Sequence, residues 1–410
     1  MRFELPQPVA RALEMLEEAG FASYAVGGCV RDWVLGAAPH DYDICTAASP
    51  ADMQRVFRAE RTVETGVQHG TLTVILSGMP LEITTFRVDG AYSDGRHPDS
   101  VRFTDRVEED LSRRDFTVNA MAYSPLRGIV DPFGGQEDCR RGIIRCVGEA
   151  EARFSEDGLR ILRALRFSAR LGFPIEEKTA RAVRVRRDQL KAISRERIAA
   201  EMGGLLLGKD AGQVLAGYPE VIAAAVPGLT ELTQGPAWTR ACCRVDASPG
   251  EEAARWAALL MDLGRDAARA AMKELKLSNS LQERTAALVA NAPVRVTPGN
   301  AWEMLARVGS ECLESLIALQ RADRIAAGED PDAAGRDAAL AEERRRELLR
   351  EHACHSLRDL AVNGRDLSAL GLRGPGIGQM LDRLLLQVVR GETPNERDAL
   401  LARARELLNA

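Results

Sequence analysis

The sequence predicts an α+β protein in which a small mixed-sheet domain is followed by domains built only of helices. Over roughly the first 145 residues, short β-rich runs alternate with helical patterns. From about Glu149 to Ala410 the residues are mostly Leu, Ala, Arg and Glu at helical spacing, with almost no strand signal. A chain of 410 residues is also too long for one ordinary hydrophobic core, so we expect two to four compact units.

The N-terminal pattern predicts strands with helices between them. The expected strands are residues 24–26, 42–45, 71–76 and 81–86. A helix should begin at the Gly27-Gly28 pair, and another should follow Ser49-Pro50, which supplies an N-cap and a proline at the first helical position. Residues 89–105 are rich in Gly, Asp, Ser and Arg and should form a long loop, which inside a compact domain tends to be functional.

Composition and charge exclude several classes of protein. No apolar run approaches the roughly 18 residues of a membrane span, and the N-terminus has no charged-then-apolar signal pattern. Eight cysteines without a C-x-x-C pair fit reduced, cytoplasmic thiols better than a disulfide framework. The net charge is −5, but residues 151–200 carry thirteen Lys or Arg against seven Asp or Glu. Such a block is usually a solvated helix face; beside a nucleotide site it would suit a phosphate backbone.

The most informative stretch is residues 27–32 (GGCVRD), followed by residues 40–43 (HDYD). A glycine pair lets the backbone approach a ligand closely, and a helix N-terminus after it presents free N–H groups to phosphates. Asp41 and Asp43, at i and i+2 on a strand, would point to the same side and could hold a divalent metal ion together. A charged edge strand is the structural alternative for this pair. Together the two elements suit metal-assisted nucleotidyl transfer.

Further chemistry-bearing elements follow along the chain. Glu82 falls in a strand pattern and could supply a third acid. Residues 113–120 (RRDFTVNA) open with two guanidinium groups, which suit triphosphate oxygens. Residues 131–135 (DPFGG) indicate a turn that closes the first domain. Residues 156–160 (EDGLR) are expected to begin a helix that continues through Arg163 and Arg166.

The motifs described above and residues 194–198 (SRERI) occur in the order found in a known family. They resemble the class II CCA-adding tRNA nucleotidyltransferases and their bacterial poly(A) polymerase relatives, within the DNA polymerase beta-like superfamily. The resemblance is close over residues 22–197. The elements NGRDL and GPGIG within residues 363–378 also resemble the C-terminal unit of the compact bacterial enzymes. Residues 226–350 resemble nothing from which a role carries over.

The resemblance implies a DNA polymerase beta-like head domain and a set of roles for individual residues. Asp41 and Asp43 would be the metal ligands for two Mg²⁺ ions, with Glu82 as a further catalytic acid. The implied nucleotide-binding residues are Gly28, Arg31, Arg114, Asp157, Arg160, Arg163 and Arg166, of which Gly28 and Arg31 would contact phosphates and the last four would form a nucleotide-recognition helix. The implied substrates are CTP, ATP and the 3′ end of tRNA.

The resemblance and the change from a mixed to an all-helical pattern near Glu149 together predict four domains. Residues 1–145 would form the catalytic head, residues 146–210 a helical nucleotide-recognition neck, residues 211–350 a helical body, and residues 351–410 a helical tail that binds tRNA. The helical remainder would hold the acceptor and elbow region of tRNA. The Gly/Pro element at 374–378 could bring backbone N–H groups to phosphates, or it could be a plain turn between helices.

The chemistry can also be argued from the residues. In-line attack by a terminal hydroxyl on an α-phosphate needs one metal ion to lower the hydroxyl's pKa and another to stabilise departing pyrophosphate. Carboxylates on one face, such as Asp41 and Asp43, could bridge two such ions. Phosphoryl transfer is mostly positioning and charge neutralisation, so no covalent nucleophile is required.

A second argument concerns the choice of C and A without a nucleic-acid template. Both bases present an exocyclic amine donor beside a ring-nitrogen acceptor, whereas U and G present an acceptor beside a ring N–H. Asp157 only accepts and Arg160 only donates, so three residues apart on a helix they would match C and A and leave unpaired groups against U or G. The same pair also fits a helix-start acid and an i,i+3 ion pair.

Two groups of rival activities remain at this point. Poly(A) polymerase shares the N-terminal chemistry, but residues 65–71 (TGVQHGT) resemble the CCA-adding pattern more than the basic-aromatic stretch of poly(A) polymerases. Enzymes that add only CC or only A also remain possible, although residues 92–99 (YSDGRHPD) resemble the loop of enzymes able to add A. A non-catalytic tRNA-binding protein would not need the intact Asp41 and Asp43.

Overall fold

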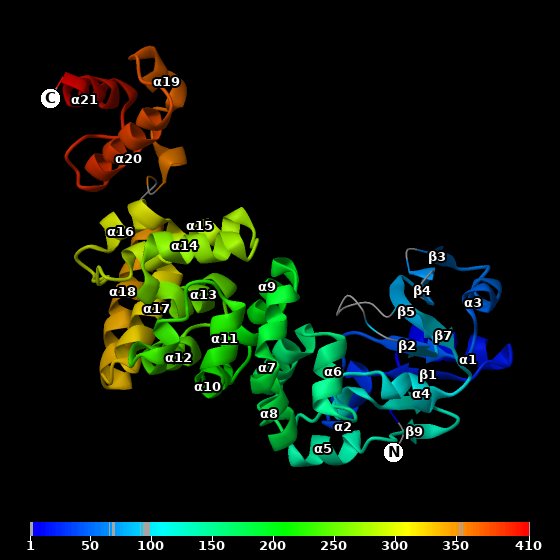
Figure 1. Cartoon of the computed structure of the whole chain (residues 1–410). Helices are drawn as coiled ribbons and strands as arrows, with labels where there is room; N and C mark the ends of the chain where they lie inside the picture. Colours follow the sequence, from blue (N-terminus) through cyan, green and yellow to red (C-terminus); the bar gives the residue numbers. More distant parts are fainter. Residues whose placement is uncertain are drawn as a thin grey trace. The chain divides into compact units, whose positions relative to one another are not determined.

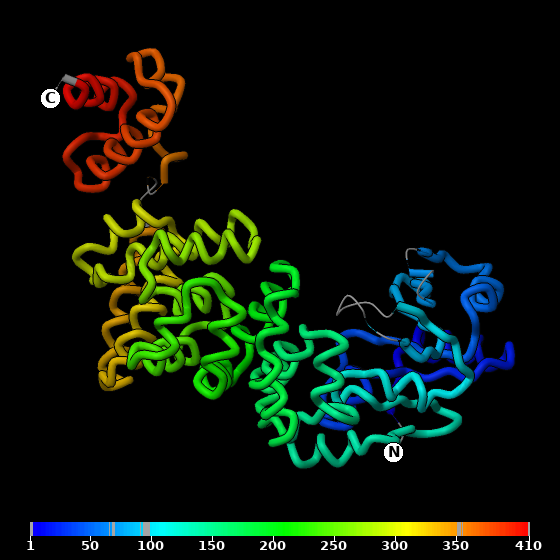
Figure 2. The backbone as a smooth tube through the Cα atoms, viewed as in Figure 1, coloured from blue at the N-terminus to red at the C-terminus, as the bar shows by residue number. Residues whose placement is uncertain are grey.

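The computed structural model describes residues 3–64, 66–67, 70–90, 92, 99–351, 354 and 356–409. The chain forms two compact units. The N-terminal unit contains Met1–Asp210 and Glu220–Ala225, and the C-terminal unit contains Ala211–Pro219 and Val226–Ala410. The course of the chain within each unit can be followed in Figures 1 and 2.

The N-terminal unit is built on a seven-stranded mixed sheet with the strand order β3-β4-β5-β2-β1-β8-β9. The strands are β1 (Ser23–Val26), β2 (Asp43–Thr46), β3 (Arg61–Val63), β4 (Thr71–Leu76), β5 (Met79–Thr85), β8 (Ala122–Ser124) and β9 (Gly128–Val130). Only β2 and β5 pair in parallel; the other neighbours are antiparallel. This confirms the predicted small mixed sheet and each of the four predicted strands, with bounds shifted by one or two residues.

Short helices cover and connect this sheet (Figure 1). They are α1 (Gln7–Glu18), α2 (Gly28–Val34), α3 (Pro50–Val56), α4 (Val107–Ser112), the 3₁₀ turn η2 (Thr117–Asn119) and α5 (Gly135–Arg141). Apolar side chains of α1 are fully buried in one core cluster with Ile44, Leu72 and Ile83 of the sheet. As predicted, one helix begins at the glycine pair, and Ser49 caps α3 in a capping box with Asp52.

The predicted loop at residues 89–105 is partly a hairpin. Strands β6 (Arg87–Asp89) and β7 (Val101–Phe103) pair with each other as a separate two-stranded sheet. The long-loop prediction is therefore wrong at both ends of the segment. The polar composition suggested a loop, but the backbone N–H and C=O groups at these ends are satisfied by pairing between two strands. Residues 91 and 93–98 within this segment, and Thr65, Gln68 and His69 of the TGVQHGT pattern, lie outside the described residues.

The rest of the N-terminal unit is helical. Its helices are α6 (Ala150–Glu156), α7 (Leu159–Leu171), α8 (Glu177–Val185), η3 (Arg187–Ala192), α9 (Arg195–Leu206) and most of α11 (Pro219–Ala225). One helix was expected to begin near Glu156, but α6 ends there and α7 begins at Leu159. Asp157 between them has an extended backbone, and its Oδ1 accepts the Leu159 N–H at 3.0 Å. The aspartate side chain thus replaces a helical backbone bond with a local one.

The described residues of the C-terminal unit form helices and no strands, as predicted. They are α10 (Ala211–Gly217), α12 (Ala237–Ala247), α13 (Glu252–Leu260), α14 (Arg265–Glu274), α15 (Asn279–Asn291), α16 (Ala301–Val308), α17 (Ser310–Ala326), α18 (Pro331–Glu351), α19 (Gly364–Ala369), α20 (Pro375–Val389) and α21 (Arg397–Asn409), with 3₁₀ turns η4 (Leu232–Gln234), η5 (Met261–Leu263) and η6 (Leu357–Asp359). Helices α19–α21 share a small apolar core, against which the partly buried Trp302 of α16 packs.

A fully buried arginine connects three elements of this unit. Arg244 of α12 donates to Asp262 at 2.5 Å, to Asp323 of α17 at 2.7 Å and to the carbonyl of Ala258 at 2.8 Å. Arg240, one turn earlier, pairs with the same Asp323, but its side chain is 44 % exposed. The two arginines therefore offer a matched comparison of a buried ion pair with an exposed one.

Replacing Arg244 with Ala is expected to lower the free energy of unfolding by about 3–5 kcal/mol, because it leaves two carboxylates without their buried partner. Arg240→Ala should cost no more than about 1 kcal/mol, since exposed ion pairs contribute little. Urea unfolding of the full chain, followed by circular dichroism, measures both. Equal destabilisation by the two variants would contradict the role given to Arg244.

Candidate active site

The glycine pair forms a tight turn between β1 and α2. Gly27 has a φ of +81°, and its N–H donates to the carbonyl of Met121 at 3.0 Å. A Cβ atom at this position would lie 2.9 Å from Nη1 of Arg114. Glycine is therefore favoured by the positive φ at this position, and its lack of a side chain leaves room for this guanidinium. The turn places Arg114 beside the start of α2.

Two acidic side chains meet where β2 and β5 run in parallel. Asp43 is the first residue of β2 and is in register with Glu82 of β5, so the sheet itself makes these two residues neighbours. Asp41 lies two residues before the strand, not within it as predicted. The ladder cannot extend further, because the partner strand β1 ends at Val26 and the chain turns at Gly27.

The electrostatics of Asp43 reflect this arrangement. Desolvation of the carboxyl raises its pKa above the ordinary aspartate value, and the neighbouring charges of Glu82 and Asp41 raise it further, against the opposing effect of Arg114. Burial is therefore the main cause of the raised pKa of Asp43, and Arg114 offsets part of the repulsion from Glu82 and Asp41.

Two adjoining cavities share these acids. The first, of about 360 Å³, is bounded by the glycine turn, by Arg114 and by residues of α7. The second, of about 490 Å³, is bounded by β5 and the β4 residue Thr73, and it includes Glu82. Both are lined by His40, Asp41 and Asp43. The carboxylates thus stand at the border between the two cavities.

Arginines dominate the first cavity. Five of them line it: Arg31, Arg114, Arg163, Arg166 and Arg170. Guanidinium carbons of Arg31, Arg163 and Arg166 lie 5.5, 5.4 and 4.6 Å from the centre of the Phe167 ring. The structure therefore brings the predicted residues Gly28, Arg31, Asp41, Asp43, Arg114, Arg163 and Arg166 to the lining of one cavity, with Glu82 in the adjoining cavity.

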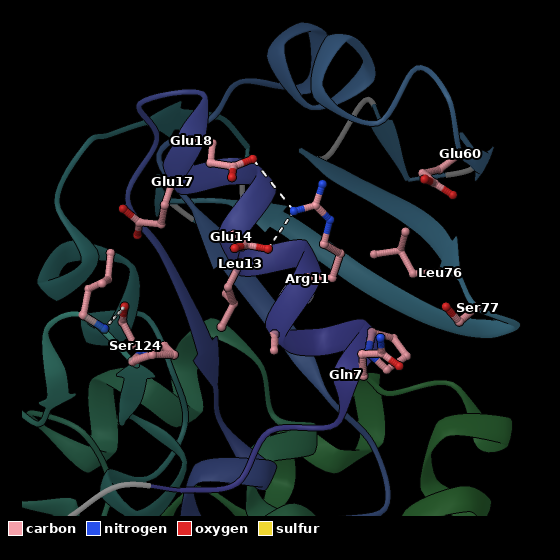
Figure 3. A pocket seen from close by; sticks show the side chains of 14 residues that line it. Gln7, Arg11, Leu13, Glu14, Glu17, Glu18, Glu60, Leu76, Ser77 and Ser124 are labelled. Atoms are coloured by element: carbon pink, nitrogen blue, oxygen red, sulfur yellow. Dashed lines mark hydrogen bonds and ion pairs between the residues drawn. The ribbon is translucent and has the colours of Figure 1, made fainter.

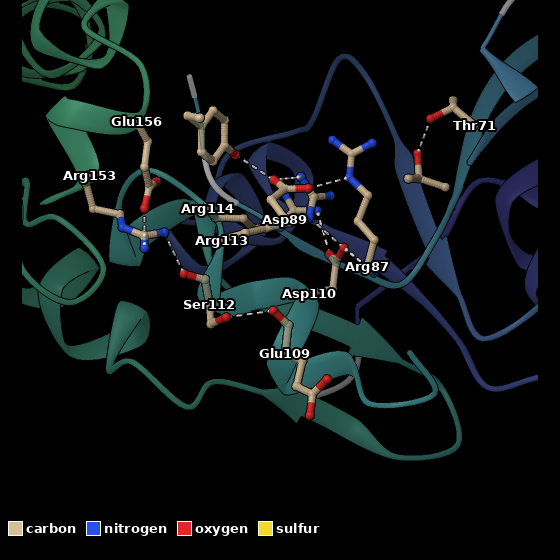
Figure 4. Close-up of polar contacts among 12 residues, drawn as sticks. Thr71, Arg87, Asp89, Glu109, Asp110, Ser112, Arg113, Arg114, Arg153 and Glu156 are labelled. Atoms are coloured by element: carbon tan, nitrogen blue, oxygen red, sulfur yellow. Dashed lines mark hydrogen bonds and ion pairs between the residues drawn. The ribbon is translucent and has the colours of Figure 1, made fainter. Parts of the chain in front are cut away.

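Arg113 does not take part in this site. Its guanidinium donates to the buried Asp110 at 2.9 Å and lies 3.8 Å from Asp89 of the β6–β7 hairpin, as Figure 4 shows. Arg87 pairs with the same Asp89 at 3.2 Å. Of the two guanidinium groups expected to suit a triphosphate, only Arg114 lines the cavity; Arg113 fastens the hairpin to α4.

Asp157 and Arg160 lie outside both cavities in this structure. Asp157 accepts a hydrogen bond from Arg197 of α9 at 2.7 Å. Arg160 donates to Glu156 at 2.5 Å and to the carbonyl of Arg113 at 3.1 Å. Both side chains are therefore engaged in internal ion pairs, but with Arg197 and Glu156 and not with each other as the i,i+3 alternative expected.

Several residues of the first cavity were given no role from the sequence, among them Asp115, Asn119 and Phe167. Asp115 and Asn119 lie within the RRDFTVNA element, and Phe167 follows Arg163 by one helical turn. The i+4 spacing of Phe167 from Arg163 on α7 was the available signal. Only the tertiary structure shows that all three hold arginines.

A third cavity, of about 730 Å³, has a different character. It lies against α1, and its charged lining is mostly glutamate: Glu14, Glu17, Glu18 and Glu60 (Figure 3). Arg11 is paired with Glu14 at 2.6 Å. Because this lining repels phosphate groups, the smaller arginine-lined cavity is the candidate nucleotide site.

Among the described residues, no three His, Cys, Asp or Glu side chains lie close enough together to hold a metal ion by themselves. No helix in the described part of the chain is long and apolar enough to cross a membrane.

Models of known families match three stretches of the chain. Residues 23–145 match the poly A polymerase head domain, residues 172–217 a probable RNA and SrmB-binding site of polymerase A, and residues 248–404 a putative tRNA nucleotidyltransferase domain 2. The last match covers most of residues 226–350, for which the resemblance of the sequence implied no role.

Relatives extend the likeness over the whole chain. The CCA-adding enzyme of Limosilactobacillus fermentum is 37 % identical over 98 % of both sequences, and that of Geobacillus stearothermophilus is 36 % identical over 95 % of this chain and 94 % of its own. The crystal structure of the Bacillus stearothermophilus CCA-adding enzyme in complex with CTP matches with a TM-score of 0.80 and 34 % identity, covering 98 % of this chain and 97 % of that one. At these identities over nearly the whole of both sequences, the chain belongs to the family of CCA-adding tRNA nucleotidyltransferases.

Proposed function

We propose that this protein adds C, C and A to the 3′ end of tRNA, using CTP and ATP and no nucleic-acid template, in the cytoplasm. The observation that carries the proposal is the placement of Asp41 and Asp43 between an arginine-lined cavity and a second cavity that Glu82 also lines. The first suits a nucleoside triphosphate, and the second suits the incoming 3′ hydroxyl of the RNA. The relatives named CCA-adding enzymes, which match over nearly their full length, support C and A as the nucleotides that are added.

The acids fit a divalent cation. Carboxylate oxygens are the ligands that Mg²⁺ prefers, and Asp41 and Asp43 line the same cavity, with Glu82 in register beside Asp43. Mg²⁺ is commonly held by one or two carboxylates together with substrate phosphates and water, which agrees with the lack of a three-residue cage among the described residues. The family uses divalent metal ions; we assign Mg²⁺ here, with Asp41 and Asp43 as ligands and Glu82 as the third acid.

The chain's own residues would perform most of the positioning. Arg31, Arg114, Arg163 and Arg166 present positive charge to the triphosphate, so binding places the α-phosphate near the carboxylates. The bound metal ions would supply activation of the 3′ hydroxyl and charge neutralisation at the pyrophosphate. Since both attacking and leaving groups are held in place, no covalent intermediate on the protein is needed.

The helical part is proposed to hold the tRNA. The head (1–145), neck (146–210), body (211–350) and tail (351–410) of the sequence prediction stay a proposal. The main boundary between the two compact units, at Asp210–Ala211, supports the division between neck and body, while Glu220–Ala225 of the proposed body belongs to the N-terminal unit. Basic residues in excess at 151–200 support contact of the neck with the acceptor end, and the tail would contact the elbow region.

One assay tests the proposed function. The protein is incubated with tRNA lacking its terminal three nucleotides, with CTP, ATP, UTP and GTP offered singly and together, and the product ends are sequenced. We expect CC with CTP alone and CCA with CTP and ATP. Long A tails on generic RNA without CTP would make the protein a poly(A) polymerase, and products that stop at CC, or A added only to tRNA already ending in CC, would assign the narrower activities.

A further inference from the structure

Asn119 occupies a central place in the first cavity that no catalytic role explains. It ends the turn η2, is 7 % exposed and lines the cavity wall. Its Oδ1 accepts a hydrogen bond from Nη1 of Arg31 at 2.7 Å. Its Nδ2 donates to Oδ1 of Asp115 at 3.3 Å. The amide thus lies between a cation from the head helix α2 and a buried anion.

The chemistry of the two partners suits an amide. A guanidinium has only donors, and an ionised carboxylate has only acceptors. The group between them must therefore accept on one side and donate on the other, which fixes the orientation of the Asn119 amide. Desolvation would raise the pKa of Asp115, but the opposing effects of Arg163 and of the Asn119 hydrogen bond hold it below the ordinary value, so this carboxyl is ionised.

The hydrogen-bonded bridge that Asn119 forms between Arg31 and Asp115 continues to the helix α7. The second oxygen of Asp115 accepts from Nε of Arg163 at 2.8 Å. Arg31, Asn119, Asp115 and Arg163 therefore form one hydrogen-bonded chain between α2 and α7, and both arginines also lie against the Phe167 ring. Every member of the chain lines the cavity.

The bridge also determines which way Arg31 faces. Its Nε and Nη2 donate to Asp32 at 2.9 and 2.7 Å, and Nη1 donates to Asn119. These contacts use three of the five guanidinium N–H groups and fix its plane, leaving two for a ligand. Without Asn119 the guanidinium would be held on the Asp32 side alone.

We propose that Asn119 is a positioning residue for nucleotide binding: it orients Arg31 toward the triphosphate and couples that orientation to Arg163 through Asp115. Asn119 itself touches no reacting atom. The proposal rests on the proposed function in one respect, namely that the arginine-lined cavity binds the nucleotide. It predicts an effect on the affinity for CTP and ATP alike, because the triphosphate is common to both.

Two substitutions test the bridge. Asn119→Ala removes both hydrogen bonds and should raise KM for CTP and for ATP by about 10- to 100-fold with little change in kcat, as expected for loss of a charge-assisted contact made equally in the ground and transition states. The ratio of UTP to CTP use should not change. Asn119→Asp is isosteric and still accepts from Arg31, but its second oxygen would face Asp115.

The pH profile of Asn119→Asp separates positioning from a structural role. The charged groups that face the introduced carboxyl or its turn are Arg31 and Asp32 of α2, Arg114, Asp115, Asp138 of α5, and Arg163 and Arg166 of α7. Near neutral pH, repulsion from Asp115 should weaken nucleotide binding. At mildly acidic pH the introduced carboxyl takes up a proton, regains a donor and should recover CTP affinity toward that of the wild type, measured as the variant-to-wild-type ratio. Asn119→Ala has no such group, so its deficit should not vary with pH.

Thr117→Val is the matched control. It removes a buried hydrogen bond of 2.7 Å to Asp138 from the same turn, and Thr117 does not line the cavity. KM values that stay at wild type in both Asn119 variants, or an Asn119→Asp deficit that does not vary with pH, would overturn the proposal. So would a KM increase in Thr117→Val equal to that in Asn119→Ala. The product ends made by the wild type test the proposed function separately, since variant-to-wild-type ratios for nucleotide binding can be measured whichever nucleotides are added.

Discussion

Replacing Asp43 with Asn is expected to lower kcat for CMP and AMP transfer by on the order of 10³-fold while leaving tRNA affinity within about twofold. Stabilisation by a bound metal ion is worth several kcal/mol, and each 1.4 kcal/mol is a factor of ten in rate. Asn keeps the size of the side chain but removes the negative charge that Asp43 shares with Glu82 and Asp41. Both transfers should fall together, because the acids serve the reaction and not the choice of base.

The measurement is single-turnover extension of tRNA lacking its last three nucleotides, with tRNA affinity followed by fluorescence anisotropy. Glu108→Gln is the control, since Glu108 is an exposed acid of α4 that lines neither cavity. It should leave both quantities unchanged. If Asp43→Asn keeps its rate within tenfold of wild type, or loses tRNA affinity in proportion to rate, Asp43 is not the metal ligand proposed here.

Local rules predicted much of the head domain from the sequence. The helix at the glycine pair, the capped start of α3 and the strands β1, β2, β4 and β5 follow from short-range propensities and were confirmed. The closeness of Asp43 and Glu82 depends instead on the parallel register of β2 with β5, thirty-nine residues apart in sequence. Sequence supplied both acids as candidates, but only strand pairing makes them neighbours.

The departures from prediction share a physical cause, which is competition between neighbouring polar groups. Arg113 and Arg114 are adjacent and chemically equal, and both lie near Asp110, at 2.9 and 3.5 Å. Arg113 also lies beside Asp89 of the hairpin, and only Arg114 lines the cavity. Asn119 could not be identified from spacing, because its role depends on two partners brought from distant parts of the chain. Such assignments need the tertiary contacts.

The proposed base-recognising pair shows the same competition. Asp157 uses one oxygen for the Leu159 N–H and the other for Arg197, but each carboxylate oxygen has a second lone pair. Arg160 donates three N–H groups, to Glu156 and to two carbonyls, and keeps two. Both side chains therefore retain bonding capacity for a base, although neither lines the cavity in this structure.

We expect Asp157→Asn and Arg160→Ala to raise the use of UTP relative to CTP by about 10²-fold or more, since a site built on matched hydrogen bonds can discriminate by about 10⁴-fold or more. Asn at position 157 adds a donor, which suits the O4 acceptor of uracil, so this variant should gain UTP use beyond its loss of rate. Competition assays with mixed CTP and UTP, read by sequencing the product ends, measure the ratio.

Arg153→Ala separates recognition from helix stability. Arg153 pairs with Glu156 at 2.6 Å, the same acid that Arg160 contacts, and it lines neither cavity. If Asp157 and Arg160 recognise the base, Arg153→Ala should lower the rate modestly and leave the UTP-to-CTP ratio at its wild-type value, while the other two variants change that ratio. If all three variants lose rate and none changes selectivity, the internal ion pairs of Asp157 and Arg160 are their whole function. The choice of C and A must then be made by residues that line the cavity.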